Sequence, residues 1–283
     1  MSLTATTTSA FYGGHVLAPN GKIYCIPVDT TGVIGVVDPT TNTFSTPISG
    51  TAVSSAYNGG VLAPNGKIYC MPYRATNVGV IDPVANTFTT FGSISDGTSS
   101  GAYNAGVVAP NGKIYCIPRY ATAVGVIDPA LNTFTSFGTT ATYSTGAYIG
   151  GVLAPNGKIY CIPLGAPTVA VIDPVLNTFT TNTISGTLPG GYAYYGGVLG
   201  PDGKIYCIPL SSTNVGVIDP VANTFTTFGT SPSAAYYGGV LAPNGKIYCI
   251  PYNGSLSPGI ISFSGLSQLP NSNYCLSAYT NKL

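Results

Sequence analysis

Short apolar runs, separated by Pro, Asn, Gly and Asp, recur along the whole chain. They are rich in Val, Ile, Thr, Tyr and Phe, which favour pleated, half-buried strands. None of them shows the 3.6-residue period of an amphipathic helix. Between two of these runs stands Asn65-Gly66, a strong signal for a tight hairpin because both residues tolerate positive φ. We therefore predict an all-β chain with almost no helix. In one stretch the four predicted strands are 60–62, 67–71, 78–81 and 87–91.

A repeat of about 45 residues occurs six times. The phrase Ala-Pro-Asn-Gly-Lys-Ile-Tyr-Cys-Ile-Pro returns with small changes, and its lysines are Lys22, Lys67, Lys113, Lys158, Lys204 and Lys246. A second phrase, Val-Gly-Val-Ile-Asp-Pro, is found in five of the repeats with small changes, with its aspartates at Asp38, Asp82, Asp128, Asp173 and Asp219. The sixth repeat has 259–263 in its place, and an atypical last repeat is typical of a capped or closed array.

Four antiparallel strands in each of six repeats predict a six-bladed β-propeller, formed as a single domain over residues 1–283. One such sheet cannot bury both of its faces, whereas sheets stacked around an axis can. β-Helix coils are too short for this repeat, and leucine-rich or helical repeats need helical patterning. We expect residues 3–9 to complete the last blade, and the atypical tail 264–283 to add a strand or a cover.

The composition excludes several classes of partner. Only 6% of the residues are charged and the net charge is +1, so the basic field that attracts nucleic acid is absent. No apolar run is long enough to span a membrane. The N-terminus lacks the basic and apolar regions of a signal peptide, so either the chain is not exported or a leader preceded it. A neutral surface rich in Thr and Asn favours the cell surface or the exterior over the cytoplasm.

The repeat resembles a known family. Asn65-Gly66-Lys67-Ile68-Tyr69, followed by 77–82 and 86–87, is similar to the YVTN-type propeller repeat, which is related to NHL repeats. The resemblance extends from about residue 11 to residue 263 and implies a propeller, often secreted or on a cell surface, with binding or scaffolding roles. The chain departs from that pattern in having Cys where a β-branched residue is usual. It has no Trp, which argues against kelch, WD40 and sialidase-type repeats.

Six cysteines occupy the same strand position in successive repeats, at Cys25, Cys70, Cys116, Cys161, Cys207 and Cys249. Equivalent points on neighbouring blades lie about 10 Å or more apart, beyond the reach of a disulfide. We predict free thiols buried between blades, and neither a metal site nor any cofactor, because metal ligands must converge on one ion. Cys275 lies outside the repeat and could pair only with a cysteine that its tail reaches.

The charged residues follow the repeat as well. The repeat Lys and Asp residues are expected together on one face, with each Asp accepting a backbone bond in an Asp-Pro turn. Glu is absent, which argues against calcium-dependent hydrolases with clustered carboxylates.

The opposite face carries the varying loops. An aligned tyrosine precedes the innermost strand of each repeat, and it serves either packing between blades or ligand contact. We predict ligand contacts from this ring and from non-repeating residues, which the fold does not require. The predicted set is Tyr12, Tyr57, Tyr103, Tyr148, Tyr194 and Tyr236 from the ring, and Tyr73, Arg74, Arg119, Tyr120 and Tyr252 from the other loops. Beside the ring lie Asn58, Asn104, Ile149, Tyr195 and Tyr237.

His15 is the only histidine, and it stands where the other five repeats have glycine. It is either a partly exposed residue at the mouth of the channel or a general base. No carboxylate partner for it is evident in the sequence.

The leading prediction is a non-catalytic binding or scaffold propeller that recognises a neutral partner, which is a protein, a peptide or a glycan, through its tyrosine-rich face. The alternative is a small-molecule lyase or hydrolase with His15 at the channel mouth. A third alternative is a structural array without a dedicated ligand. Replacing His15 separates the first two, because an enzyme loses turnover while a binder is indifferent.

Overall fold

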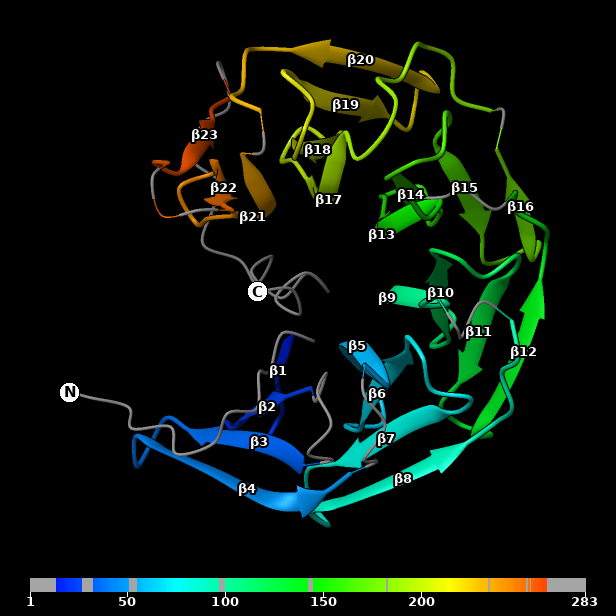
Figure 1. The fold of residues 1–283 in the computed structure, drawn as a ribbon, viewed down its shortest axis with the longest axis vertical. Helices are drawn as coiled ribbons and strands as arrows, with labels where there is room; N and C mark the ends of the chain where they lie inside the picture. The colour runs from blue at the N-terminus through cyan, green and yellow to red at the C-terminus, as the bar shows by residue number, and fades with distance from the viewer. Residues whose placement is uncertain are drawn as a thin grey trace. The chain divides into compact units, whose positions relative to one another are not determined.

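The computed structural model describes residues 14–26, 33–50, 55–96, 100–141, 145–181, 183–233, 235–252, 254 and 256–263. All helix or strand elements that the structure has within these ranges are strands, with no helix among them, so the predicted all-β fold is confirmed (Figure 1). The same ranges contain no helix that is long and apolar enough to cross a membrane. The segments 3–9 and 264–283, together with Tyr12 and Cys275, lie outside the described residues, and so does the expected closure by the N-terminal strand.

The strands form six separate antiparallel sheets, and within each sheet the strands pair in chain order. This arrangement is the predicted set of six propeller blades. The first three sheets contain β1 (His15–Leu17), β2 (Ile23–Cys25), β3 (Val33–Asp38) and β4 (Thr43–Ser49); β5 (Tyr57–Leu62), β6 (Ile68–Pro72), β7 (Val78–Asp82) and β8 (Thr87–Phe91); and β9 (Tyr103–Val108), β10 (Ile114–Pro118), β11 (Val124–Asp128) and β12 (Thr133–Phe137).

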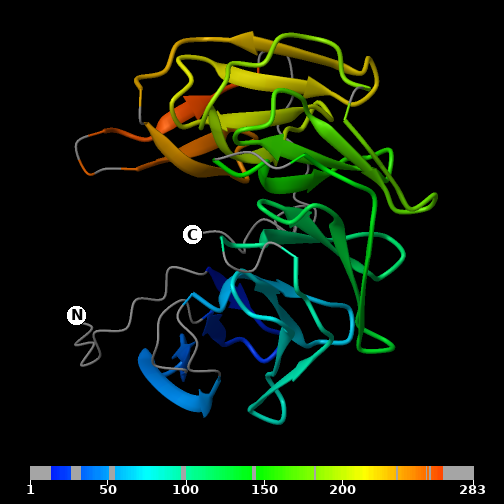
Figure 2. The same ribbon diagram turned by 45° about the vertical axis from the view of Figure 1, so that its right-hand side comes forward.

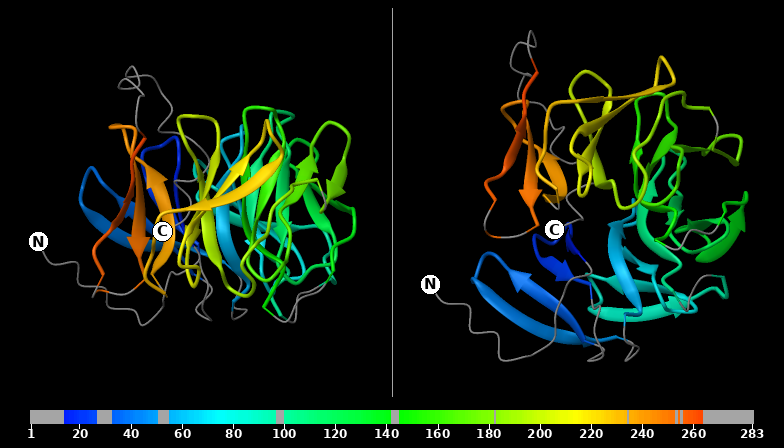
Figure 3. Two further views of the ribbon diagram at one scale, coloured as in Figure 1. Left: turned by 90° about the horizontal axis from the view of Figure 1, so that it is seen from above. Right: turned by 45° about the horizontal axis from the view of Figure 1, so that its top comes forward.

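The last three sheets repeat the pattern, except that the sixth has three described strands. They contain β13 (Tyr148–Leu153), β14 (Ile159–Pro163), β15 (Ala170–Asp173) and β16 (Thr178–Thr180); β17 (Tyr194–Leu199), β18 (Ile205–Pro209), β19 (Val215–Asp219) and β20 (Thr224–Phe228); and β21 (Tyr236–Leu241), β22 (Ile247–Pro251) and β23 (Gly259–Ile261). Figures 2 and 3 show each sheet as a twisted meander.

The chain divides into two compact units, with the boundary in β12. The described part of the N-terminal unit is 14–136 and holds the first three sheets, and that of the C-terminal unit is 137–263 and holds the last three. The single domain over 1–283 stays a prediction.

The hairpin between the first two strands of each sheet forms as predicted, but its loop differs in detail. The N–H of Gly66 donates to the carbonyl of Ala63 at 3.0 Å, and the N–H of Ala63 donates to the carbonyl of Lys67 at 2.9 Å. The loop is therefore Pro64-Asn65-Gly66, a turn followed by a glycine bulge rather than a two-residue turn. Only Gly66 has positive φ (79°), and Asn65 instead accepts the N–H of Lys67 through its side chain at 3.1 Å.

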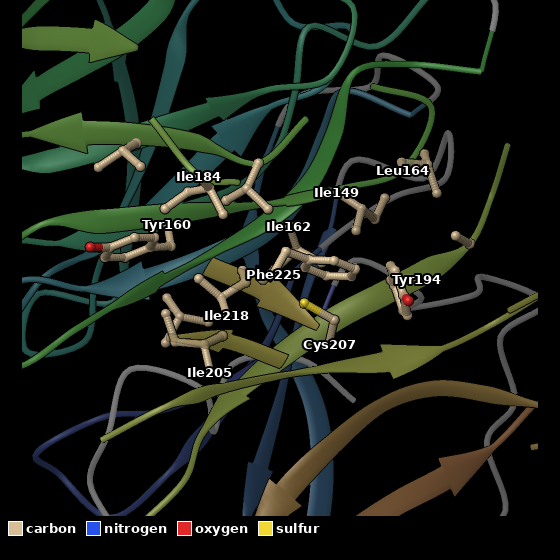
Figure 4. Close-up of a cluster of buried hydrophobic side chains, with 14 of the residues drawn as sticks. Ile149, Tyr160, Ile162, Leu164, Ile184, Tyr194, Ile205, Cys207, Ile218 and Phe225 are labelled. Atoms are coloured by element: carbon tan, nitrogen blue, oxygen red, sulfur yellow. The ribbon is translucent and has the colours of Figure 1, made fainter. Parts of the chain in front are cut away.

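The core lies between consecutive sheets within each unit. Val16 and Ile26 of the first sheet pack with Ile68 and Cys70 of the second in one buried cluster. The fourth and fifth sheets form an equivalent cluster, in which Tyr160 and Ile162 lie over Ile205, Cys207 and Phe225 (Figure 4). A sheet that lies between two others, such as the second, has apolar contacts on both faces. Its strands therefore do not alternate cleanly between apolar and polar residues.

Glycine within the first strand of a sheet allows consecutive sheets to approach closely. A Cβ on Gly60 would lie 2.7 Å from Cδ1 of Ile26 in the preceding sheet, and one on Gly106 would lie 2.5 Å from the sulfur of Met71. The positions equivalent to His15 are therefore crowded.

Candidate functional site

The repeat lysines and aspartates lie together, as predicted, and they form an ion pair within each of the first five sheets. The Nζ to Oδ2 distances are 3.3, 3.1, 3.2, 3.3 and 3.0 Å in the first five sheets, for Lys22–Asp38, Lys67–Asp82, Lys113–Asp128, Lys158–Asp173 and Lys204–Asp219. Each pair joins the turn between the first two strands to the turn between the last two.

The aspartates also hold their turns. Oδ1 of Asp82 accepts the N–H groups of Val84 and Ala85, both at 3.0 Å. The hydrogen bond from Ala85, followed by that from Lys67, holds the pKa of the Asp82 carboxyl below its usual range. These carboxylates are thus engaged by backbone and lysine, which agrees with the turn-forming interpretation.

The described tyrosines of the aligned ring are buried. Tyr57 is 0% exposed, its hydroxyl donates to Oδ1 of Asn77 at 2.7 Å, and its ring packs edge-to-face on Phe88. The hydroxyl of Tyr103 donates to the carbonyl of Ala123 at 3.2 Å. This placement agrees with the packing alternative. The same burial is found at Tyr57, Tyr103, Tyr148, Tyr194 and Tyr236.

A second set of tyrosines, which the sequence analysis did not single out, links consecutive sheets. They belong to the Ile-Tyr-Cys phrase. The hydroxyls of Tyr24, Tyr69 and Tyr160 donate to the carbonyls of Pro83, Pro129 and Pro220 in the following sheet, at 3.3, 3.2 and 3.4 Å. The signal that could have revealed them is the Asn-x-x-x-Tyr spacing of five of the six repeats, because that Asn donates to the same hydroxyl.

The six repeat cysteines are free and buried, as predicted. Cys70 packs in the cluster between the first and second sheets, and Cys207 packs between the fourth and fifth. Burial raises the pKa of the Cys25 thiol to about 11. Among the described residues no group of three or more His, Cys, Asp and Glu could hold a metal ion.

Two positions on the varying face differ between sheets and lie next to each other. One follows the ring tyrosine, and the other follows the proline that ends the second strand. Strand pairing opposes Tyr57 to Pro72 and Tyr236 to Pro251, so the residue after each lies at the same end of the sheet. The first position holds Asn58, Asn104, Ile149, Tyr195 and Tyr237, and the second holds Tyr73, Arg119, Leu164, Leu210 and Tyr252.

In the N-terminal unit this face carries a cation between aromatic rings. The Arg119 guanidinium lies 5.5 Å from the ring centroid of Tyr73 and 5.2 Å from that of Tyr120, and its Nη1 donates to the Tyr73 hydroxyl at 2.8 Å. Nearby, Nδ2 of Asn58 donates to Oδ1 of Asn104 at 2.6 Å. Tyr73, Arg119 and Tyr120, three of the predicted contact residues, therefore come together. Arg74, the residue after Tyr73, is exposed.

In the C-terminal unit the same positions hold a stack of three tyrosines. The rings of Tyr195 and Tyr237 lie 4.3 Å apart at 9°, and those of Tyr237 and Tyr252 lie 4.2 Å apart at 29°. Tyr237 is 40% exposed and Tyr252 is 52% exposed. The core pairs of ring tyrosine and phenylalanine are instead all edge-to-face, at 62° to 82°.

His15 begins β1 and lies opposite Cys25 of β2. It is half-buried. The equivalent glycines press against the preceding sheet, as Gly197 does against Ile162 and Gly239 against Ile208. His15 therefore places an imidazole at a position where the other five repeats have glycine.

No protein-family model and no curated protein matches the sequence, so the YVTN/NHL-type resemblance is not confirmed at family level. Solved structures do match. A catalytically inactive histidine-to-alanine variant of virginiamycin B lyase from Staphylococcus aureus, solved with quinupristin, has a TM-score of 0.73 and 13% identity, and the match covers 94% of this chain and 85% of that one.

Two further matches extend the comparison. A streptogramin B lyase has a TM-score of 0.70 and 12% identity, covering 92% of this chain and 85% of that chain. Hydrazine synthase from Kuenenia stuttgartiensis has a TM-score of 0.64 and 16% identity, and the match covers 87% of this chain and 75% of that chain. These likenesses establish the fold, and the chain is a six-bladed β-propeller.

The leading functional prediction needs correction. It expected a non-catalytic binding or scaffold module, whereas the solved structures that match over nine-tenths of this chain include lyases. An enzymatic role is therefore open to this chain, and the catalytic alternative agrees better with the comparison. The expected partners and the expected cell-surface or secreted location stay predictions.

Proposed function

We propose that this chain is a small-molecule lyase in which His15 acts as the base. The observation that carries the proposal is the position of this imidazole. It is the only histidine, and it replaces the glycine of five other repeats in the innermost strand of a blade. The propellers that match this chain include lyases, and one of them is described as inactive after a histidine is changed to alanine.

The repeat explains why the imidazole suits a role beyond folding. Glycine at the equivalent position lets the preceding sheet pack closely, as Gly60 does with Ile26. A side chain there brings no packing that the repeat requires. Imidazole is the side chain most often used to transfer protons in enzymes. A half-buried imidazole on an inner strand is accessible to a small substrate and is partly shielded from water.

The chemistry follows from the reaction class. His15 would remove a proton from a carbon atom next to a carbonyl group. The electron pair of that C–H bond forms a carbon–carbon double bond, and the leaving group departs with the electron pair of its own bond to the neighbouring carbon. The proton rests on the imidazole until the leaving group or water accepts it, and no water enters the products.

The test uses quinupristin as the first substrate, because it was solved with a structurally similar lyase. The purified chain is incubated with quinupristin, and the masses of the products are measured by mass spectrometry. Elimination within a ring leaves the mass unchanged, whereas hydrolysis adds the mass of one water. A wider panel of cyclic depsipeptides and lactones follows if quinupristin is not consumed.

Three variants define the role of His15. His15→Gly restores the residue of the other repeats and should abolish turnover while the fold is retained. His15→Gln keeps a polar side chain without a base and should also be inactive. Val84→Thr, at a position that is 89% exposed on the turn between β7 and β8, is the control and should keep full activity. Turnover that survives in His15→Gly, or a product that carries an added water, would reject the proposal.

A further inference from the structure

Arg119 is a cation that the fold holds between two tyrosine rings. The repeat lysines of the first five sheets are paired with aspartates, but no carboxylate among the described residues lies within ion-pair distance of Arg119. Among the described residues it interacts with two tyrosines, through the hydrogen bond to Tyr73 and the contacts with the rings of Tyr73 and Tyr120. We call Tyr73, Arg119 and Tyr120 the arginine clamp.

The backbone fixes the geometry of the arginine clamp. The carbonyl of Ala102 accepts the N–H of Arg119 at 2.9 Å, and the N–H of Ala102 donates to the carbonyl of Tyr73 at 2.7 Å. Gly101 has a φ of +101°, and a Cβ there would lie 2.4 Å from the ring of Tyr73. The hydroxyl end of the ring therefore packs against a position where only glycine fits, so its orientation is set before any ligand arrives.

The clamp offers hydrogen-bond donors and a positive charge. Guanidinium has five N–H donors and no acceptor. The Tyr73 oxygen accepts one of them, and its own proton has no acceptor among the described residues. Nε of Arg119 is buried and has no hydrogen-bond partner among the described residues, which leaves one donor of the charged group unsatisfied there. The complement of such a surface is a negatively charged group with several acceptor atoms.

The equivalent positions show that the fold does not require an arginine here. Leu164 takes the place of Arg119 in the fourth sheet, where it is 2% exposed and packs in the core. Leu210 takes that place in the fifth sheet. An apolar side chain therefore suffices for folding, whereas arginine brings a charge and an unpaired buried nitrogen.

We propose that the arginine clamp binds the carboxylate of a small organic acid. The Nη1 and Nη2 edge matches the planar, bidentate geometry of a carboxylate. The Tyr73 hydroxyl supplies a further donor, and the two rings flank a flat or apolar body attached to the acid. This site is distinct from His15 and does not rest on the proposed lyase activity.

The experiment titrates isotope-labelled full-length chain with 3-phenylpropionate and follows the amide and Arg119 side-chain signals by NMR. The matched neutral probe is 3-phenylpropanamide, which has the same ring and nearly the same shape. Inorganic phosphate is the third probe. We expect saturable shifts at the clamp with the acid, and binding of the amide that is weaker by about tenfold or more, since charge-assisted bonds are the stronger ones.

The variants separate the clamp from general charge effects. Arg119→Leu installs the residue of the fourth and fifth sheets and should weaken acid binding by about tenfold or more. Tyr73→Phe removes only the hydroxyl and should weaken it by a smaller factor. Arg74→Leu removes the same charge from the exposed neighbouring position and should change binding by less than about threefold, as expected for an exposed charge in salt. Thermal unfolding of each variant checks that it is folded.

Several results would overturn this assignment. Equal binding of the acid and the amide, unchanged affinity in Arg119→Leu, or an equal loss in Arg74→Leu would each show that the clamp does not recognise the carboxylate. Tighter binding of phosphate would assign the site to a different anion. The absence of any acid-dependent shift at the clamp at the highest concentration would remove the site altogether. All of these readouts are independent of turnover.

Discussion

The hydroxyl of Tyr69 ties the second sheet to the third, and its removal is the most direct test of how the blades are held together. Tyr69 is fully buried. Its hydroxyl lies 3.2 Å from the carbonyl of Pro129 and 3.2 Å from Oδ1 of Asn132, and it accepts Nδ2 of Asn65 at 3.0 Å. Pro129 and Asn132 both belong to the last turn of the following sheet. Tyr69→Phe deletes this oxygen and keeps the ring.

The expected magnitude follows from what remains after the change. The ring keeps its edge-to-face contact with Phe91, at 6.1 Å between centroids, so the packing is unchanged. The Pro129 carbonyl still accepts Nδ2 of Asn65 at 3.1 Å, and Asn132 is exposed to water. No acceptor is left buried and unpaired, so the loss is that of one net hydrogen bond, about 1 kcal/mol of the free energy of unfolding.

The sixth sheet supplies the matched control. Tyr248 occupies the equivalent position, but among the described residues its hydroxyl bonds only to Asn244, from which it accepts a solvent-exposed hydrogen bond at 2.9 Å. Tyr248→Phe should therefore cost less than about 0.5 kcal/mol. Urea denaturation followed by circular dichroism measures both variants, with the slope m expected to stay constant. Equal losses in the two variants, or no loss in Tyr69→Phe, would refute the inference that this hydroxyl links the sheets.

Three further predictions follow from the repeat. The pKa of the Asp82 carboxyl is lower in the folded chain than in the unfolded chain, where it is about 4. The stability that this carboxylate contributes is therefore present above the unfolded pKa and is lost as the pH falls through the folded pKa. Thermal unfolding measured from neutral to acid pH should show this loss, and the loss should be smaller in Asp82→Asn. Burial raises the pKa of the Cys70 thiol, so iodoacetamide should label it slowly in the native chain and rapidly in urea, as mass spectrometry would show; rapid native labelling would contradict the burial. Gly79→Ala places a Cβ 2.8 Å from the ring of Phe88 and should lower the free energy of unfolding by about 1–3 kcal/mol in the same urea assay, whereas an unchanged value would show that the Phe88 ring moves freely.

The repeat made the sheets predictable from the sequence, because each strand and turn appears several times with the same punctuation. The hairpin at Asn65-Gly66, the free cysteines and the Lys–Asp pairs all depend on local sequence or on spacing around the repeat. The exact loop was not predictable in the same way, since the choice between a two-residue turn and a glycine bulge depends on how Ala63 and Lys67 pair.

The side-chain roles on the varying face were harder to predict. In a chain whose sheets are buried on both faces, alternation along a strand does not separate core from surface. Tyr57 and Tyr237 are adjacent to each other in the repeat pattern, yet the first is 0% exposed and the second is 40% exposed. The sequence also gives no distance between blades, so neither the tyrosine stack nor the contact of Arg119 with Tyr73 could be derived from it.

The repeat also acts as an internal control that separates folding from function. At a position where most blades share one residue, that residue is compatible with the blade, and a departure needs another explanation. His15 departs from the glycine of the five other repeats, whereas the position of Arg119 varies and holds leucine in the fourth and fifth sheets, so leucine is also compatible with the blade there. Installing a residue that other blades use, through His15→Gly or Arg119→Leu, should therefore change the free energy of unfolding by no more than about 1 kcal/mol, the range in which surface and glycine effects fall. A loss of several kcal/mol in either variant would place that side chain in the fold and would remove the physical basis for assigning it a functional role.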